Sequence, residues 1–219
     1  IIPCKGSVGA SGDLAPLAHL VLVMLGEGDA EVDGRRMSGA EALAARGLEP
    51  IVLSGKEGLA LINGTQIMTA VGCMVWDRAV NLMKAADIAA ALSLEALKGT
   101  RSAFDRRITE VRPYPGQMAT TENVLALTED SAIIASHKNC SKVQDAYSRR
   151  CVPQVHGASK EALAQATRTL SIEINAVTDN PSIVPDTGEA IPGGNSHGQP
   201  IALVMDYLKL RIAELGNMS

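Results

Sequence analysis

Apolar residues recur with helical spacing over most of this chain. The longest such stretch covers residues 65–97, which contain no proline and would form about 50 Å of helix at ~1.5 Å per residue. Neither side of that helix is consistently polar, so we expect it to be buried on most sides. Shorter stretches of the same period, one of them after a break rich in glycine and proline at 99–117, predict helices at about 14–25, 117–127, 154–174 and 196–215.

Capping residues mark where several helices begin. Asp13 precedes the first helix and carries a side chain that can cap it. Ser38-x-x-Glu41 and Ser54-x-x-Glu57 have the spacing of capping boxes, in which serine and glutamate satisfy each other's backbone N–H groups. Each box is followed by apolar residues, and each therefore predicts a further helix.

Turn residues separate the helices and predict small amounts of β-structure. Residues 30–37 alternate around Asp33-Gly34, a pair typical of a two-residue hairpin turn. Proline, glycine and asparagine between 180 and 194 indicate a crossover with a short hairpin. Residues 137–153 are polar and without a clean period, so we expect an irregular loop that carries function.

Composition agrees with a mainly α protein, a bundle of long helices with small β-hairpins. Only 2% of the 219 residues are aromatic, and such a core suits closely packed helices. A helix as long and apolar as 65–97 is typical of a bundle shared with other subunits. The net charge of −4 provides no electrostatic footprint for nucleic acid. Polar residues interrupt the apolar region 59–76, which predicts a buried helix and not a membrane span.

Cysteine and histidine usage predicts neither disulfides nor a metal site. The four cysteines are widely spaced and form no C-x-x-C pair, which favours buried thiols in a reducing cytoplasm. The four histidines show no zinc-binding spacing, so no metal is predicted. These residues are Cys4, Cys73, Cys140 and Cys151, and His19, His137, His156 and His197.

The tripeptide Ala10-Ser11-Gly12 can form its own electrophile. If the Gly12 nitrogen attacks the Ala10 carbonyl carbon, a five-membered ring closes within the main chain and the Ala10 carbonyl oxygen leaves as water. Loss of the Ser11 hydroxyl as a second water then leaves a methylidene group on the ring. The product is 4-methylidene-imidazol-5-one. Glycine at position 12 allows the tight bend that ring closure needs, although the tripeptide alone is also what a glycine-rich turn before a helix would contain.

The longer string around the tripeptide resembles the signature of the histidine and aromatic amino acid ammonia-lyases. Residues 6–19 read Gly-Ser-Val-Gly-Ala-Ser-Gly-Asp-Leu-Ala-Pro-Leu-Ala-His. Further segments at 61–66, 178–181 and 193–198 are similar to the same family. The segment 136–154 is similar to its histidine branch. The resemblance spans residues 3 to 219.

This resemblance implies a fold, a cofactor and a reaction. The fold would be the long-helix bundle of the ammonia-lyase, fumarase/aspartase-like type, assembled as a homotetramer in the full-length protein. Residues 1–219 would form a single segment of a longer lyase, without its N-terminal loop domain and its C-terminal part. The enzyme would be a carbon-nitrogen lyase for a small amino acid, with no nucleic-acid or membrane partner. It would eliminate ammonia from L-histidine and give trans-urocanate.

Two other functions stay open. The same cofactor serves phenylalanine or tyrosine ammonia-lyases and aminomutases, and only the segment 136–145 favours histidine. Alternatively, the chain is a non-catalytic helical module in which the tripeptide never cyclises. One departure also bears on the substrate: Ser196 stands where the family pattern has phenylalanine.

The resemblance assigns roles to polar residues in two regions. Asn63 would contact the ring carbonyl or the substrate amine, although a helix cap is its simplest interpretation, and Gln66 would pack beside it. The helix N-termini near Asp13 and Asn63 would stabilise negative charge on the ring oxygen, so that Asn63→Ala lowers turnover more than affinity. Asn195 and His197 would support the ring environment.

Three residues of the 137–153 loop complete the predicted site. Gln144 would be a polar contact near the ring. Tyr147 would handle a proton, although a lone tyrosine more often packs in a core. Arg150 would clamp the substrate carboxylate, because its planar fork matches two oxygens. We expect its neighbour Arg149 to point elsewhere and to form a surface salt bridge.

Overall fold

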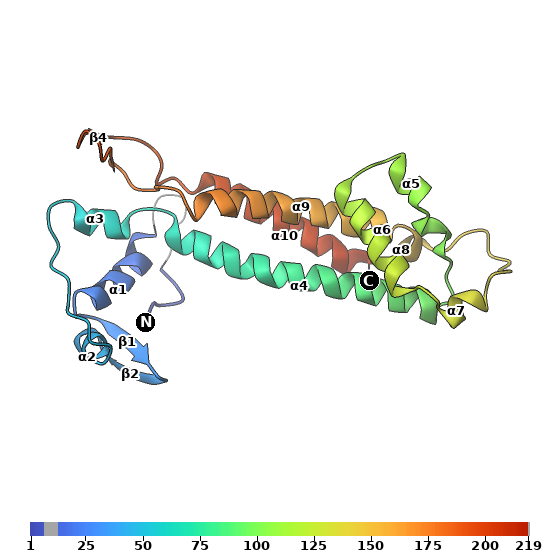
Figure 1. Ribbon diagram of the computed structural model, residues 1–219, viewed down its shortest axis with the longest axis horizontal. Coiled ribbons are helices and arrows are strands. Elements are labelled where there is room, and N and C mark those ends of the chain that lie inside the picture. Colours follow the sequence, from blue (N-terminus) through green and yellow to red (C-terminus); the bar gives the residue numbers. More distant parts are fainter. Residues whose placement is uncertain (7–12, 219) are drawn as a thin grey trace. The chain divides into compact units, whose positions relative to one another are not determined.

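The chain is mainly α-helical with two small β-hairpins, as the sequence predicts (Figure 1). The computed structural model describes residues 1–6 and 13–218. The chain divides into two compact units. The first contains residues 1–72 and 170–202, and the second contains residues 73–169 and 203–219.

The first unit begins with a helix, a hairpin and a second helix. Helix α1 covers Leu14–Met24. Strands β1 (Asp29–Val32) and β2 (Arg35–Ser38) pair antiparallel, with Val32 opposite Arg35 across the predicted Asp33-Gly34 turn. Both turn residues have positive φ, 51° and 77°, as a type I′ turn requires. The hairpin prediction is therefore confirmed.

One of the two predicted capping boxes forms in full. At α2 (Gly39–Ala44) Ser38 Oγ accepts from the N–H of Glu41 at 3.4 Å, and the Glu41 carboxylate accepts from the N–H of Ser38 at 3.0 Å. At α3 (Glu57–Ile62) the Ser54 N–H donates to the Glu57 carboxylate at 2.7 Å. However, the residue at the N-cap is Lys56, with φ 72°, so the second box is incomplete and that prediction is wrong.

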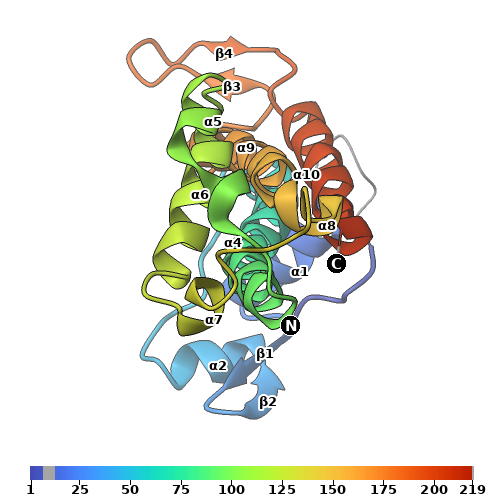
Figure 2. The ribbon, with the colours of Figure 1, turned by 90° about the vertical axis from the view of Figure 1, so that its right-hand side faces the viewer.

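Three long helices follow the predicted ranges closely. Helix α4 covers Gln66–Ala96, α9 covers Val152–Glu173 and α10 covers Gln199–Met218. Between α9 and α10, β3 (Ser182–Ile183) and β4 (Ala190–Ile191) form the second antiparallel hairpin. In the second unit the three helices lie side by side, with α6 (Pro115–Leu127) along α9 (Figure 2).

Two clusters of buried side chains form the core of the second unit. In the first, the small residues Ala79, Ala162 and Ala166 let α4 and α9 approach each other and pack with two larger residues of α10, Val204 and Leu208. Trp76 packs against this cluster and donates from Nε1 to Thr167 Oγ1 at 2.8 Å. The second cluster joins α4, α6 and α9 through Leu94, Val124 and Val152, and it includes Phe104 from the segment between α4 and α6.

Short helices occupy segments where the sequence predicted irregular chain. The segment 99–117 contains the 3-10 helix η1 (Arg101–Phe104) and α5 (Arg106–Glu110). Helix α7 (Ala132–Ala135) follows α6. The predicted loop 137–153 contains α8 (Tyr147–Arg150), and α9 begins inside it at Val152. That loop is therefore shorter than predicted.

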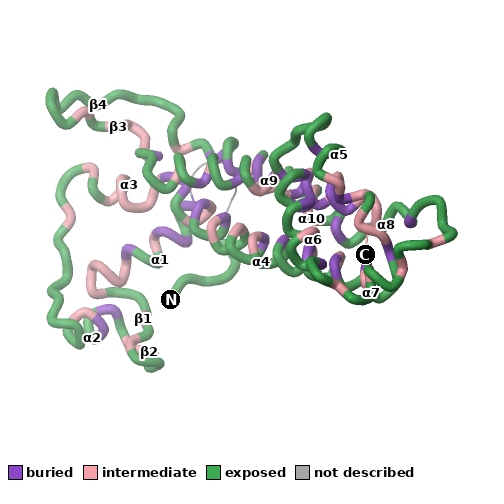
Figure 3. The backbone as a smooth tube through the Cα atoms, turned by 45° about the vertical axis from the view of Figure 1, so that its right-hand side comes forward, coloured by how far each residue is buried: buried purple, intermediate pink, exposed green. Residues whose placement is uncertain are grey.

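Within this chain α4 is less buried than its sequence predicts. Large apolar side chains along it are exposed, among them Val71 at 55%, Met74 at 61% and Leu92 at 60% (Figure 3). Of the most apolar 18-residue window within 57–96, only 22% is buried, and by length and composition alone this stretch could cross a membrane. This chain alone therefore does not bury α4 on most sides, and its burial in a bundle shared with other subunits stays a prediction.

Candidate functional site

Asp13 lies where two helices of the first unit begin. It is 1% exposed. Its backbone N–H donates to Gly64 O at 3.3 Å, and its Oδ2 accepts from the N–H of Met68, in the first turn of α4, at 3.0 Å. Among the described residues its side chain makes no capping bond to α1. The prediction that Asp13 caps α1 is therefore wrong, because the carboxylate caps α4 instead.

The tripeptide Ala10-Ser11-Gly12 lies outside the described residues. Asp13 follows it directly in sequence. The hydrogen bonds of Asp13 therefore tie the residue after the tripeptide to the start of α4.

The bend between α3 and α4 is fastened to the chain that follows α9. Thr65 Oγ1 donates to Glu173 Oε1 at 2.6 Å, and the N–H of Thr65 donates to Thr178 Oγ1 at 3.4 Å. Gly64, which precedes Thr65 in the bend, has φ +137°, and a Cβ there would lie 2.5 Å from Thr178 Oγ1. Position 64 therefore requires glycine for both its dihedral angle and its space.

Asn63 is the half-buried residue that ends α3. Its Nδ2 donates to Asp179 Oδ1 at 3.0 Å and to Asn180 O at 3.4 Å. Asp179 also pairs with the ammonium group of Lys56. Partial burial raises the pKa of the Asp179 carboxyl, but hydrogen bonds from Lys56, Asn63 and the backbone N–H of Asn180 outweigh it and hold this pKa below its ordinary value.

The other predicted residues of the first unit also make hydrogen bonds. Gln66 is exposed and donates to Asn63 O at 3.5 Å. Asn195 donates from Nδ2 to Val177 O at 3.3 Å. His197 accepts at Nδ1 from the N–H of Gln199, at the start of α10, at 3.2 Å. The first unit thus gathers polar groups around the bend that precedes α4, but His197 acts there as a helix cap.

A cavity of about 530 Å³ in the second unit is lined by two of the predicted residues, Gln144 and Arg150. Lys138, Lys142 and Asp145 also line it, so cationic groups outnumber the one carboxylate. The Nε of Arg150 and the Oε1 of Gln154, which also lines the cavity, are buried and have no hydrogen-bond partner among the described residues. This cavity can accept an anionic group.

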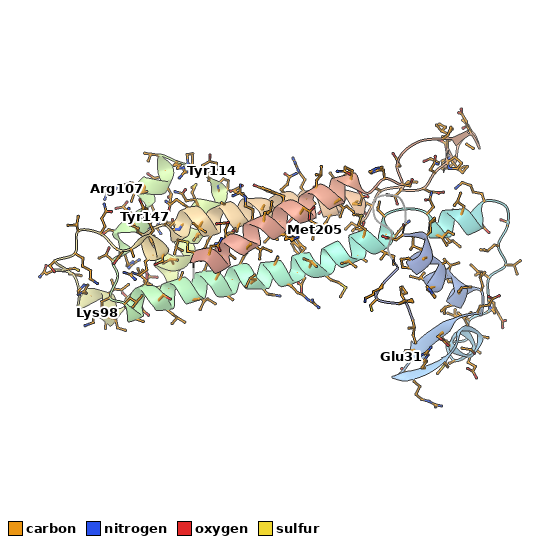
Figure 4. All side chains as sticks on the ribbon, turned by 180° about the vertical axis from the view of Figure 1, so that it is seen from behind. Glu31, Lys98, Arg107, Tyr114, Tyr147 and Met205 are labelled. Atoms are coloured by element: carbon orange, nitrogen blue, oxygen red, sulfur yellow. The ribbon has the colours of Figure 1, made fainter. Side chains whose placement is uncertain are left out.

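Tyr147 is 69% exposed, which excludes the core-packing interpretation within this chain. The Arg150 guanidinium lies 4.1 Å from the centroid of its ring, a cation–π arrangement. In Figure 4 Tyr147 lies at the same end of the second unit as Lys98. The two residues with predicted proton-handling and carboxylate-binding roles are therefore in direct contact.

The short helix α8 is held in place by a carboxylate that the sequence reasoning missed. Asp145 Oδ2 accepts from the N–H of Thr100 at 2.7 Å. Its Oδ1 lies 3.7 Å from Arg149 Nε, and both side chains are largely buried. Arg149 therefore does not form the surface salt bridge that we expected. Asp145 follows Gln144 in the family-like segment, and that position was the available signal.

The exposure of the cysteines differs from the prediction. Cys4 is exposed and the other three are half-buried, so the prediction of buried thiols is wrong within this chain; all four are free thiols. Over residues 1–6 and 13–218, no group of three or more histidine, cysteine or acidic side chains stands close enough to hold a metal ion.

The predicted site residues fall into two groups, one in each unit. Asp13, Asn63, Gln66, Asn195 and His197 belong to the first unit, whereas Gln144, Tyr147 and Arg150 belong to the second. The family model for aromatic amino acid lyases matches residues 1–219, and the chain belongs to that family.

Individual relatives agree with this assignment. A histidine ammonia-lyase from Gloeobacter violaceus is 58% identical over the whole chain, which spans 43% of that relative's length. The crystal structure of histidine ammonia-lyase from Trypanosoma cruzi is 42% identical, with a TM-score of 0.85 over 99% of this chain and 40% of that one. The tyrosine aminomutase from Streptomyces globisporus is 39% identical, with a TM-score of 0.88 over 99% of this chain and 44% of that one.

Proposed function

We propose that this chain is the cofactor-bearing segment of a histidine ammonia-lyase, a carbon-nitrogen lyase that converts L-histidine to trans-urocanate and ammonia. One observation carries the proposal. The N-termini of α1 and α4 meet at Asp13, the residue that follows Ala10-Ser11-Gly12. The positive ends of both helix dipoles therefore lie beside the residue that follows the tripeptide, and such ends stabilise a nearby negative charge.

The residues fit the implied cofactor, 4-methylidene-imidazol-5-one. The tripeptide has the required residue types, and its C-terminal neighbour is fixed by backbone and side-chain hydrogen bonds. The cofactor would supply an electrophile that no ordinary side chain offers, and with it an electron sink for the leaving amine.

The second unit supplies groups suited to the amino acid itself. Arg150 has an unpaired buried Nε at a cationic cavity, and we assign it the α-carboxylate of the substrate. The exposed hydroxyl of Tyr147 beside it is assigned proton transfer at the substrate's β-carbon. Gln144, which also lines the cavity, would hold the substrate's orientation.

We further propose that the complete protein is a cytoplasmic homotetramer whose sites draw on several subunits. The exposed apolar side chains of α4 support this assembly, because a water-soluble protein covers such a stripe. The division of the site residues between two units is also compatible with sites completed by neighbouring subunits. Sedimentation of the complete protein tests the tetramer, and a monomer at micromolar concentration would refute it.

Intact mass and product identity test the function together. Cofactor formation makes the chain lighter by two water molecules, and Ser11→Ala prevents it. With L-histidine the complete enzyme should release urocanate. Because the chain is also similar to a tyrosine aminomutase, L-tyrosine and L-phenylalanine are tested as well. If either yields coumarate, cinnamate or a β-amino acid instead, the histidine assignment is wrong. An unmodified mass would favour the non-catalytic module.

A further inference from the structure

Another cavity of the second unit, about 290 Å³ in volume, is lined by residues to which the proposed function assigns no role. Gln117 in the first turn of α6, Glu161 of α9 and Arg211 of α10 contribute to its lining, and we call it the Arg211 cavity. Gln154 of α9 lines both this cavity and the one that contains Arg150. Its volume is at the lower end of the range for ligand pockets, which suits a ligand the size of a single amino acid.

Two guanidinium groups of the Arg211 cavity are held by aromatic rings. The Cζ of Arg112 lies 5.3 Å from the centroid of the Tyr114 ring, and the Cζ of Arg211 lies 5.1 Å from the centroid of the Tyr207 ring. Within the described part of the chain, neither guanidinium forms an ion pair or a hydrogen bond. A cation–π contact uses no N–H donor of the guanidinium, so both groups can still bind a carboxylate.

The side chain of Gln117 adds a buried donor to the same cavity. Gln117 is 2% exposed, and its Nε2 has no hydrogen-bond partner among the described residues. Close packing of α6 on α9 fixes its backbone, because a Cβ on Gly157 would lie only 2.6 Å from the Cα of Gln117. A buried NH2 group without an acceptor destabilises the folded protein. A ligand that brings an acceptor to this group is therefore favoured.

The Arg211 cavity also offers acceptors. The Oε1 of Gln154 is buried and has no partner within residues 1–6 and 13–218. Glu161 contributes a carboxylate, whose Oε1 accepts from the N–H of Gly116 at 2.6 Å. Two arginines against this glutamate leave the lining with a surplus of positive charge. A matching ligand therefore has a carboxylate for the donors and an N–H group for the acceptors.

We propose that the Arg211 cavity binds a small carboxylate that also bears an N–H group, the chemistry of an amino acid or an imidazole carboxylate. Arg112, Arg211 and Gln117 bind the carboxylate, and Gln154 accepts from the N–H group. Because Gln154 also lines the cavity of Arg150, this ligand contacts a side chain that borders the proposed substrate site. Binding requires neither Ser11 nor turnover, so it goes beyond the proposed function and does not depend on it.

Two probes of similar shape separate the two requirements. Imidazol-4-ylacetate has a carboxylate and an N–H group, whereas phenylacetate has the carboxylate alone. Their dissociation constants are measured by calorimetry on the complete protein with Arg150→Gln, which removes the guanidinium of the neighbouring cavity. Arg211→Gln should weaken both probes about 10-fold, because a hydrogen bond between charged groups is lost. Gln154→Met should weaken imidazol-4-ylacetate about 3- to 10-fold and phenylacetate less than about 2-fold.

Gln117→Met distinguishes a binding role from a structural one. Methionine has a similar length but no donor, so both probes should bind about 3- to 10-fold more weakly. The ligand-free variant should unfold at no lower temperature than its parent, because the Nε2 that it loses has no partner among the described residues. Arg168→Gln is the matched control, since Arg168 is an exposed arginine of α9 that does not line the cavity. It should leave both dissociation constants unchanged.

Three results would overturn the inference. Absence of binding of imidazol-4-ylacetate at about 10 mM means that the cavity takes no such ligand, whether or not a neighbouring subunit fills it. If Arg211→Gln has no effect, or Arg168→Gln has the same effect, the probe binds elsewhere. If Gln117→Met lowers Tm by more than about 4 °C, the amide has a structural role. Failure of the proposed function is distinguishable, because it appears as an unmodified mass and no deaminated product, whatever the two probes do.

Discussion

A buried carboxylate in the second unit provides the most quantitative prediction. Asp87 on α4 is 2% exposed and accepts hydrogen bonds from three residues on two other helices. His156 Nδ1 donates to Oδ1 at 2.9 Å, Asn123 Nδ2 donates to Oδ2 at 2.7 Å, and the ammonium group of Lys160 also donates to Oδ2. Lys160 donates in addition to Thr120 Oγ1 at 2.7 Å.

Removing this charge should destabilise the second unit strongly. Asp87→Asn leaves the largely buried Lys160 ammonium without a counter-charge, which typically costs about 3–5 kcal/mol. Replacing both partners, Asp87→Leu with Lys160→Met, should cost much less than the sum of the single changes, because no buried charge then remains.

The fluorescence of Trp76 reports specifically on unfolding of the second unit. Trp76 is the only tryptophan of the chain, it belongs to the second unit, and it packs against the α4–α9–α10 cluster. Urea unfolding followed by its fluorescence therefore reports the free energy of unfolding of this unit. A cost below about 1 kcal/mol for Asp87→Asn, or additivity in the double variant, would refute the argument.

The pH dependence has a definite sign. Burial raises the pKa of the Asp87 carboxyl, but hydrogen bonds from His156, Asn123 and Lys160 outweigh it, so this pKa lies below its ordinary value in the folded state. Asp87 therefore stabilises the fold above about pH 4 and loses this contribution as the pH falls through its folded pKa. The difference in unfolding free energy between the wild-type chain and Asp87→Asn should shrink below about pH 4.

Three further predictions concern packing, substrate binding and assembly. Gly157→Ala would place a Cβ 2.6 Å from the backbone of Gln117, so urea unfolding should show a loss of about 1–3 kcal/mol. Arg150→Lys removes the planar fork, and KM for L-histidine should rise about 10-fold with little change in cofactor content by mass. Leu92→Glu on the exposed apolar side of α4 should shift the complete protein to smaller species in sedimentation, and an unchanged tetramer would contradict that role of α4.

Local sequence signals predicted most of the fold. The periodicity of 65–97 and the Asp33-Gly34 pair act through neighbouring residues alone, and both elements appear where expected. Asp13 was misjudged, and Lys56 was not singled out, because their partners are distant. The Asp13 carboxylate finds Met68 instead of its own helix, and Lys56 pairs with Asp179, 123 positions away. No pattern within a few residues of either position contains that information.

The candidate site shows the same limit. Gln144, Arg150 and Asn63 could be singled out by resemblance to a family, but the direction of the Asn63 amide depends on Asp179 and Asn180, which only the fold brings to it. The exposure of α4 has a related cause. The apolar composition of α4 is typical of a buried helix, yet this chain leaves many of the apolar side chains of α4 exposed.

The hydrogen bonds of Asp13 also impose an order of events on biosynthesis. Its partner Met68 is 55 positions further along the chain, so the residue next to the tripeptide is not fixed until that later segment has left the ribosome and folded. If ring closure requires this residue to be fixed, maturation of the cofactor is a consequence of folding and not of translation. A chain held in urea from release onward should then keep its full mass, and lose two waters only after the denaturant is removed.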